Sequence, residues 1–97
     1  MADPTRVVYE MAISHADFFR TLSFALNNAP YEVHGTEVVV ADGEKKLTIS
    51  LSAESRRSFG PIPLPVTGVE LVFEGYGTQE REQFLAHFNN CYRRGGG

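Results

Sequence analysis

The side chains of this chain best suited to metal binding or nucleophilic chemistry are three histidines and a single cysteine. His87 and Cys91 are four residues apart, so on a helix they share a face and could act as two metal ligands or as an activated thiolate. Two ligands do not make a metal site, and Cys91 falls on a predicted apolar stripe, where a thiol packs inertly. His15 at a predicted helix start and His34 in a predicted turn are typical structural histidines. The sequence therefore predicts no catalytic residue, no metal site and no cofactor.

Two adjacent arginines form the candidate anion site. Arg56 and Arg57 stand beside Phe59 and a run with prolines at 61, 63 and 65, a stiff segment suited to an anion or an acidic peptide. The alternative is that both guanidinium groups are solvated or pair with surface glutamates. A small-molecule or anion-binding domain that uses Arg56 and Arg57 is the second hypothesis for function.

Two glycine-containing segments partly match motifs that bind or carry other groups. The segment 75–78, Gly-Tyr-Gly-Thr, precedes a predicted helix whose amides favour anions, but it lacks the lysine of a P-loop. The tail 93–97, Arg-Arg-Gly-Gly-Gly, looks like the C-terminus of ubiquitin-like modifiers and sulfur carriers, whose terminal carboxylate is adenylated. Those tails leave a β-grasp strand, whereas this one leaves a predicted helix and fits a flexible end. A C-terminal glycine carrier is the third hypothesis.

Hydrophobic periodicity predicts the elements that must position these residues. The first helix has Ser14 as its N-cap and stops at Ala29-Pro30, and Thr78 is predicted to cap the second helix. Three alternating prolines within 54–65 favour a long loop or an edge segment. In chain order we predict a strand over 6–13, a helix from 15 to about 28, three strands within 31–53, the segment 54–65, a strand over 69–74 and a helix from 78.

Two tight turns set the register of the three central strands. His34-Gly35 and Asp42-Gly43 are two-residue hairpin signals with alternating apolar and polar flanks. Closing the turns on these pairs sets Tyr31 opposite Val38 and Val38 opposite Leu47, so both turns agree on the faces of the sheet. The apolar face collects Tyr31, Val33, Val38, Val40, Leu47, Ile49 and Leu51; the polar face collects Glu32, Glu37, Val39, Lys46, Thr48, Ser50 and Ser52.

These elements predict an α+β fold in the order β-α-β-β-β-β-α. Each helix has one apolar stripe and the sheet has one apolar face, so we expect a two-layer sandwich with both helices on one side of a mainly antiparallel sheet. The order resembles one half of the TATA-binding-protein fold. That resemblance is one of topology, because no residues with which that family reads nucleic acid can be matched here and the outer face is acidic.

Composition narrows the classes of partner. The chain has 97 residues, 42% of them apolar, which fits one domain over 1–97 with flexible ends at 1–5 and 95–97. A formal net charge of −3 disfavours nucleic acid, whose binding requires phosphate neutralisation. Its one cysteine cannot form an internal disulfide, and no segment resembles a secretion signal or a membrane span. We therefore expect a cytoplasmic protein without membrane or nucleic-acid partners.

Nothing in the sequence is left over to cover the outer face of the sheet. Val8, Val39 and Val72 lie on that face among glutamates. Scattered valines are ordinary on an open sheet, whereas valines clustered into a patch with an acidic rim would be typical of a dimer or partner interface.

Phe24 is the other anomaly, because it points away from the apolar stripe of its helix. It either packs beneath the 54–65 segment, against Phe59 or Ile62, or contacts another chain. The favoured hypothesis is a non-enzymatic domain that acts by protein association, as a homodimer or with a protein partner, through Val8, Phe24, Val39 and Val72.

Overall fold

The computed structural model describes residues 4–59 and 62–95, excepting the side chains of 57–59, 62 and 93–95. Of the ends predicted to be flexible, residues 1–3, 96 and 97 lie outside this description, while Thr5 and Gly95 belong to regular elements. In chain order the elements are β1 (Thr5–Met11), α1 (His15–Ala25), β2 (Glu32–His34), β3 (Glu37–Asp42), β4 (Lys45–Leu51), β5 (Ser55–Phe59), β6 (Ile62–Glu74) and α2 (Thr78–Gly95).

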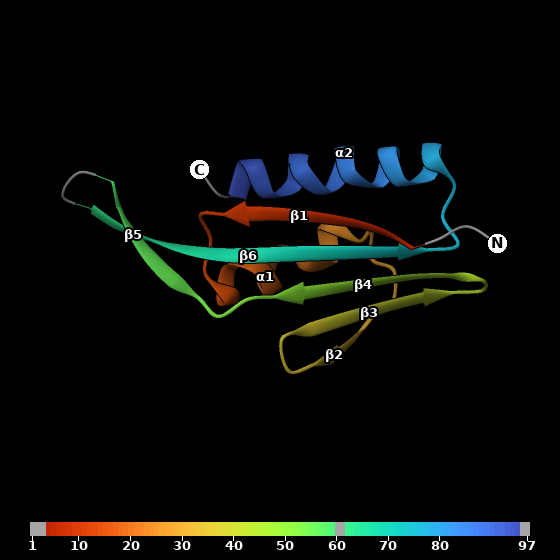
Figure 1. Ribbon diagram of the computed structural model, residues 1–97, viewed down its shortest axis with the longest axis horizontal. Coiled ribbons are helices and arrows are strands. Elements are labelled where there is room, and N and C mark those ends of the chain that lie inside the picture. Colours follow the sequence, from red (N-terminus) through yellow and green to blue (C-terminus); the bar gives the residue numbers. More distant parts are fainter. Residues whose placement is uncertain (1–3, 60–61, 96–97) are drawn as a thin grey trace.

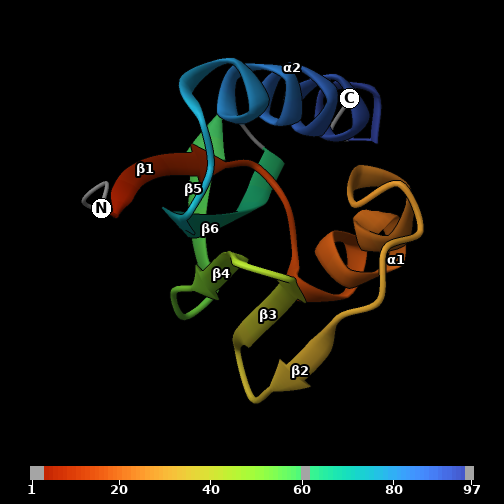
Figure 2. The same ribbon diagram turned by 90° about the vertical axis from the view of Figure 1, so that its right-hand side faces the viewer.

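The strands form one six-stranded sheet in the order β1-β6-β4-β3-β2, with β5 paired to β6 off this path. Neighbouring strands are antiparallel throughout. Figures 1 and 2 show both helices on one side of the sheet, so the predicted α+β arrangement is confirmed. The outer face carries no covering element within the described residues.

The core lies between the inner face of the sheet and the two helices. Phe18 of α1 stacks on Tyr92 of α2 with ring centroids 4.9 Å apart, and the Tyr92 hydroxyl donates to the Phe18 carbonyl at 2.9 Å. Burial of these apolar side chains is the main stabilising term of the fold. The fully or nearly buried strand residues are Val38, Val40, Leu47, Ile49, Leu51, Val66, Val69, Leu71 and Phe73. The predicted inner face is therefore confirmed for the central strands, whereas Val33 on the edge strand β2 is 48% exposed.

The two hairpins have a different register from the predicted one. His34 pairs with Glu37 and Asp42 pairs with Lys45, so the central turn residues begin at Gly35 and Gly43. Both glycines have positive φ, +65° and +62°, whereas neither turn residue that follows them does. That pattern fits a turn with glycine at its first central position, not the predicted one with glycine second. Each pairing shifts by two residues, which preserves the face of every side chain.

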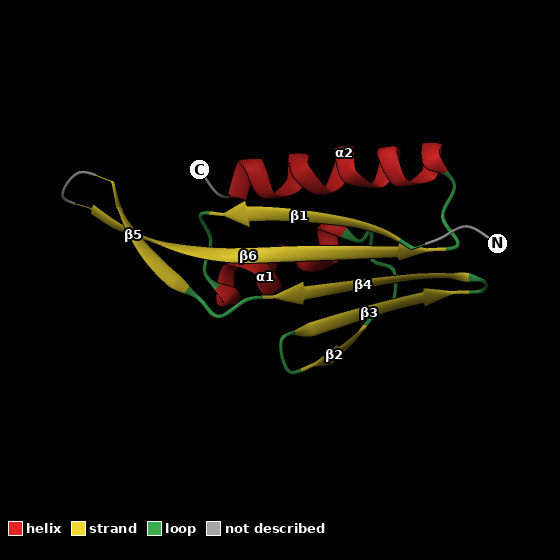
Figure 3. Cartoon of the chain, viewed as in Figure 1, coloured by secondary structure: helices red, strands yellow, loops and turns green. Residues whose placement is uncertain are grey.

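Of the two structures predicted for the segment 54–65, a long loop or an edge segment, the edge segment is correct within the described residues, where β5 pairs with β6 alone and forms a hairpin arm with it. β5 pairs with the first residues of β6. Figure 3 shows these two strands projecting beyond the rest of the sheet, along the longest dimension of the molecule, which is 49 Å. The Ser52 N–H donates to the Gly68 carbonyl, and the Gly68 N–H donates to the Ser52 hydroxyl, so the backbone groups of Gly68 point to the side of β6 on which β4 lies. Every second residue of a strand directs its backbone groups to the same side, so those of Val66 and Leu64 point toward β5. Pro63 and Pro65 consequently turn their missing N–H groups to the free edge, where proline is tolerated.

The helix boundaries also differ from the prediction. α1 ends at Ala25 rather than near Asn28, because Asn27 and Asn28 adopt positive φ. The Asn28 N–H donates to the Ser23 carbonyl at 2.8 Å and the Asn27 N–H to the Phe24 carbonyl at 3.1 Å, a Schellman ending with asparagine in place of glycine. The Ser14 cap is confirmed, since its hydroxyl accepts from the Asp17 N–H.

Candidate interaction surface

The outer face of the sheet is polar with isolated valines. Cross-strand register places Val72, Thr48 and Val39 in one row, with Thr48 between the two valines. Val8 lies opposite Glu70 in the next row and is 64% exposed, whereas Val39 and Val72 are only partly exposed. The valines therefore do not form one continuous patch, and Val8 is the strongly exposed apolar side chain of this face within the described part of the chain.

Val8 stands at the centre of β1, which is an edge strand. β1 pairs with β6 on one side only, and Figure 2 shows β1 at one margin of the sheet, with α2 above it and α1 to the right. Along β1 the side chains alternate between partly buried and exposed. The partly buried ones, Val7, Tyr9 and Met11, pack against the core, and Asn89 of α2 donates to the Tyr9 hydroxyl at 3.1 Å. The inner side thus fixes the strand and leaves its outer side open.

The backbone groups of β1 also divide into two sets. Because Gly68 bonds Ser52, the even-numbered residues of β6 direct their N–H and C=O groups toward β4 and the odd-numbered ones toward β1. Residue pairs such as Val7 with Leu71 and Tyr9 with Val69 are then the hydrogen-bonded pairs. The backbone N–H and C=O groups of Arg6, Val8 and Glu10 therefore point to the free edge.

Two other interactions fix the ends of β1. The Arg6 guanidinium donates from Nε to a Glu70 carboxylate oxygen across the outer face, with 70% of the Arg6 side chain exposed. After the strand, the buried Thr67 hydroxyl donates to the Ile13 carbonyl at 2.8 Å. The surface ion pair between Arg6 and Glu70 contributes little to stability, and it draws the arginine side chain across the outer face toward β6.

Phe24 is 71% exposed, so the hypothesis that it packs beneath the 54–65 segment is wrong. It lies on α1, in the helical layer, while Val8, Val39 and Val72 lie on the outer face of the sheet. The Phe24 carbonyl accepts a hydrogen bond from His87 Nε2 at 2.8 Å, which ties the end of α1 to α2. A single flat contact cannot cover Phe24 and Val8 together.

His87 contacts both Cys91, one turn further along α2, and the end of α1. The Cys91 sulfur lies 3.6 Å from His87 Nε2, the same nitrogen that contacts the Phe24 carbonyl. Among the described residues, no three histidine, cysteine or acidic side chains gather as a metal site would require. His15 likewise bonds the Ser52 carbonyl through Nε2 at 2.7 Å, and its N–H is capped by the Glu54 carboxylate.

The candidate anion site is only partly described. Arg56 is exposed on β5 and pairs in register with Pro65. The Arg57 side chain lies outside the described residues, so the paired-arginine site stays a prediction.

The turn before α2 is internally satisfied. α2 begins at Thr78, so Thr78 is the first residue of the helix and not its predicted cap, which is displaced by one position. The Gly77 N–H donates to the Glu80 carboxylate at 3.0 Å. Lys45 Nζ donates to the same carboxylate group at 2.7 Å. The Lys45 ammonium and the Gly77 N–H hold the pKa of Glu80 below its usual value, and Glu80 raises the pKa of Lys45. A carboxylate of the chain itself therefore occupies the place that a phosphate would take.

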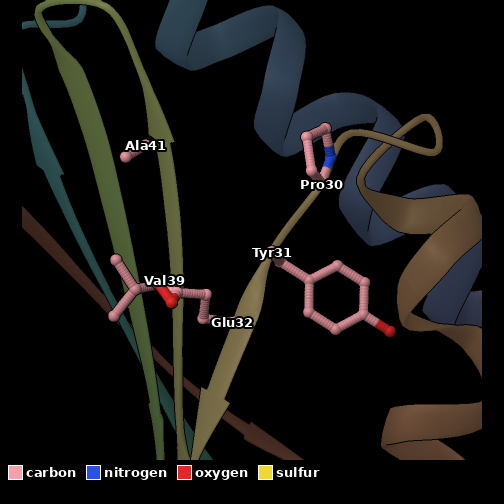
Figure 4. A pocket seen from close by; sticks show the side chains of 5 residues that line it. All are labelled: Pro30, Tyr31, Glu32, Val39 and Ala41. Atoms are coloured by element: carbon pink, nitrogen blue, oxygen red, sulfur yellow. The ribbon is translucent and has the colours of Figure 1, made fainter.

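A shallow hollow of about 180 Å³ lies on the outer face at the opposite margin of the sheet. Its lining residues are Pro30, Tyr31, Glu32, Val39 and Ala41. Figure 4 shows Glu32 and Val39 side by side and the Tyr31 ring turned away from them toward α1. With one carboxylate among small apolar groups, the hollow has no convergent set of polar groups for a small ligand.

Comparison of the chain with protein-family models, curated proteins and solved structures found no match. No helix in the described residues is long and apolar enough to cross a membrane. The class that the geometry defines is an α+β domain with one face of its sheet uncovered in the described part of the chain.

Proposed function

We propose that this protein is a non-enzymatic domain that acts by protein association. It forms a homodimer at the margin of its outer sheet face that is formed by β1, with Val8 at the centre of the contact. One observation carries the proposal: Val8 is 64% exposed at the centre of an edge strand whose inner side is anchored to the core. An exposed apolar side chain with charged neighbours fits the anatomy of an interface, in which a polar rim surrounds an apolar centre. We also place the protein in the cytoplasm, since its one cysteine cannot supply an internal disulfide.

Charge favours the margin over the middle of the face as the contact. On the outer face, within the described residues, carboxylates outnumber the two cationic side chains, which are those of Arg6 and Lys46. The carboxylates belong to Glu10, Glu32, Glu37, Glu70 and Glu74. Stacking two such faces would bring like charges together in a contact that excludes water, at a cost in free energy. A lateral contact at β1 leaves most of these carboxylates in solvent.

Sedimentation velocity over about a hundredfold dilution tests the proposal, because a dimer dissociates on dilution. We expect the wild type to be dimeric and V8K to be monomeric at every concentration. V39K/V72K and F24K are matched controls that place the same charge elsewhere, and both should stay dimeric. A monomeric wild type would refute the proposal. Loss of the dimer in V39K/V72K alone would refute a contact at Val8 and would indicate one at the row of Val72, Thr48 and Val39.

A further inference from the structure

We propose that the dimer forms by antiparallel pairing of the β1 strands of two copies about a two-fold axis through Val8. This inference rests on the proposed function and names both the partner and the register. The paired strands would join two six-stranded sheets into one continuous sheet.

The backbone of β1 meets the first requirement, which is a row of outward hydrogen-bonding groups. Arg6, Val8 and Glu10 direct their N–H and C=O groups to the free edge, as the Gly68 to Ser52 bonds imply. An antiparallel partner can pair only where its own outward residues face these three. Two copies of β1 satisfy this condition when Val8 faces Val8 of the second copy, and each of the three residue pairs then exchanges two backbone hydrogen bonds.

The side chains meet the second requirement, because the sequence of β1 is self-complementary about Val8. In this register Arg6 faces Glu10 of the second copy and Glu10 faces its Arg6, so both cross-strand pairs carry opposite charges. Val7 faces Tyr9 of the second copy on the inner side. Moving the register by two residues in either direction sets Val8 against a charged residue, which removes the charge pairing.

Within the described residues, β6 is the one strand that pairs with β1, so the other edge of β1 carries no strand there. Val8 and Arg6 are strongly exposed, and both helices lie on the other side of the sheet from the outer face that bears them (Figure 2). Arg6 holds Glu70 through Nε, and a guanidinium has further donors on its terminal nitrogens with which to bind a second carboxylate. Charged residues on an edge strand oppose pairing with other chains, so the same two residues also restrict the choice of partner.

A charge-swap experiment tests the register directly. In R6E, carboxylates face carboxylates in both cross-strand pairs of a homodimer, and in E10R, guanidinium groups face guanidinium groups. We expect each single variant to dimerise at least about tenfold more weakly than the wild type, because attraction is replaced by repulsion at two sites. An equimolar mixture of R6E and E10R restores both opposite-charge pairs, so native mass spectrometry should show the heterodimer in excess over both homodimers. K46E, which reverses a charge on the same face away from β1, should dimerise as the wild type does.

The outcomes separate this inference from the proposed function. Heterodimer formation by the mixture, with weakened dimers for each single variant, supports the two-fold β1 pairing. A wild-type dimer that V8K disrupts but that R6E and E10R leave intact would overturn the register and keep the proposed function. A wild type that is monomeric under the same conditions would overturn both. Circular dichroism of each variant confirms that the fold is retained.

Discussion

Proline substitution at two adjacent positions of β1 distinguishes the inward from the outward backbone groups of this strand. Val7 pairs with Leu71 and its N–H points into the sheet, whereas the Val8 N–H points to the free edge. V7P removes a ladder hydrogen bond next to the fully buried Leu71, and V8P removes none in the monomer. The two substitutions therefore have opposite consequences for folding and for assembly.

The expected magnitudes follow from burial. In V7P the Leu71 carbonyl loses its partner inside the sheet, a penalty of about 1 to 3 kcal/mol, and contacts of the partly buried Val7 side chain are lost as well. We expect V7P to lower the free energy of unfolding by about 3 kcal/mol in total. In V8P the replaced side chain is mostly exposed, so the cost should stay within about 1 kcal/mol.

Urea denaturation gives the free energy of unfolding, and sedimentation velocity of the same samples gives the state of assembly. V8P should be folded and monomeric, because it deletes the central backbone donors of the β1 pairing. A V8P variant less stable than V7P would show that the backbone groups of β1 have the reverse phase, and the reasoning from Gly68 would then be refuted.

The remaining predictions concern the fold. G75A should lower the free energy of unfolding by at least about 2 kcal/mol, because Gly75 has a φ of +78° and a Cβ there would lie 2.4 Å from the Glu44 carbonyl oxygen. G43A should lower it by about 1 kcal/mol, because Gly43 also has a positive φ but a Cβ there would meet no atom within 4 Å. Urea denaturation of both variants checks this, and equal effects would contradict the close approach. Burial raises the pKa of Tyr92 above its ordinary value, so the unfolded state ionises first and stability falls as the pH rises above about 10. Y92F should show a smaller decline, because Tyr76, whose pKa burial also raises, still contributes. Urea denaturation at two alkaline pH values measures the decline, and an unchanged decline would contradict the prediction.

The faces of the sheet were predictable because the side-chain period of a strand is two. The turn chemistry was the weaker signal: His34-Gly35 suggested a turn with glycine second, but positive φ is available to Gly35 and not to His34 in this fold. The resulting shift by two residues left every face unchanged, so the core prediction remained correct while the pairs of residues were wrong.

Two other features depend on interactions that local sequence does not specify. The prolines of 54–65 predicted a long loop or an edge segment because a central strand would reject them, and the choice between the two depended on β6 leaving a free edge at Pro63 and Pro65. α1 ends three residues earlier than predicted because asparagines in positive φ close the helix, a role more often filled by glycine. Among the candidate site residues, Val8 and Phe24 could be found from periodicity, whereas the importance of Arg6 and Glu10 required knowing that β1 lies at the edge.

Residue-resolved hydrogen exchange along β1 at two protein concentrations tests the central claim most directly. Amides held in a hydrogen bond exchange slowly, and those that only the dimer protects must lose protection when the dimer dissociates. We predict that the amides of Arg6 and Val8 are protected at high concentration and exchange freely on dilution, while those of Val7 and Tyr9 stay protected at both. Free exchange of the Val8 amide at high concentration, in a sample that is dimeric by sedimentation, would contradict the β1 pairing.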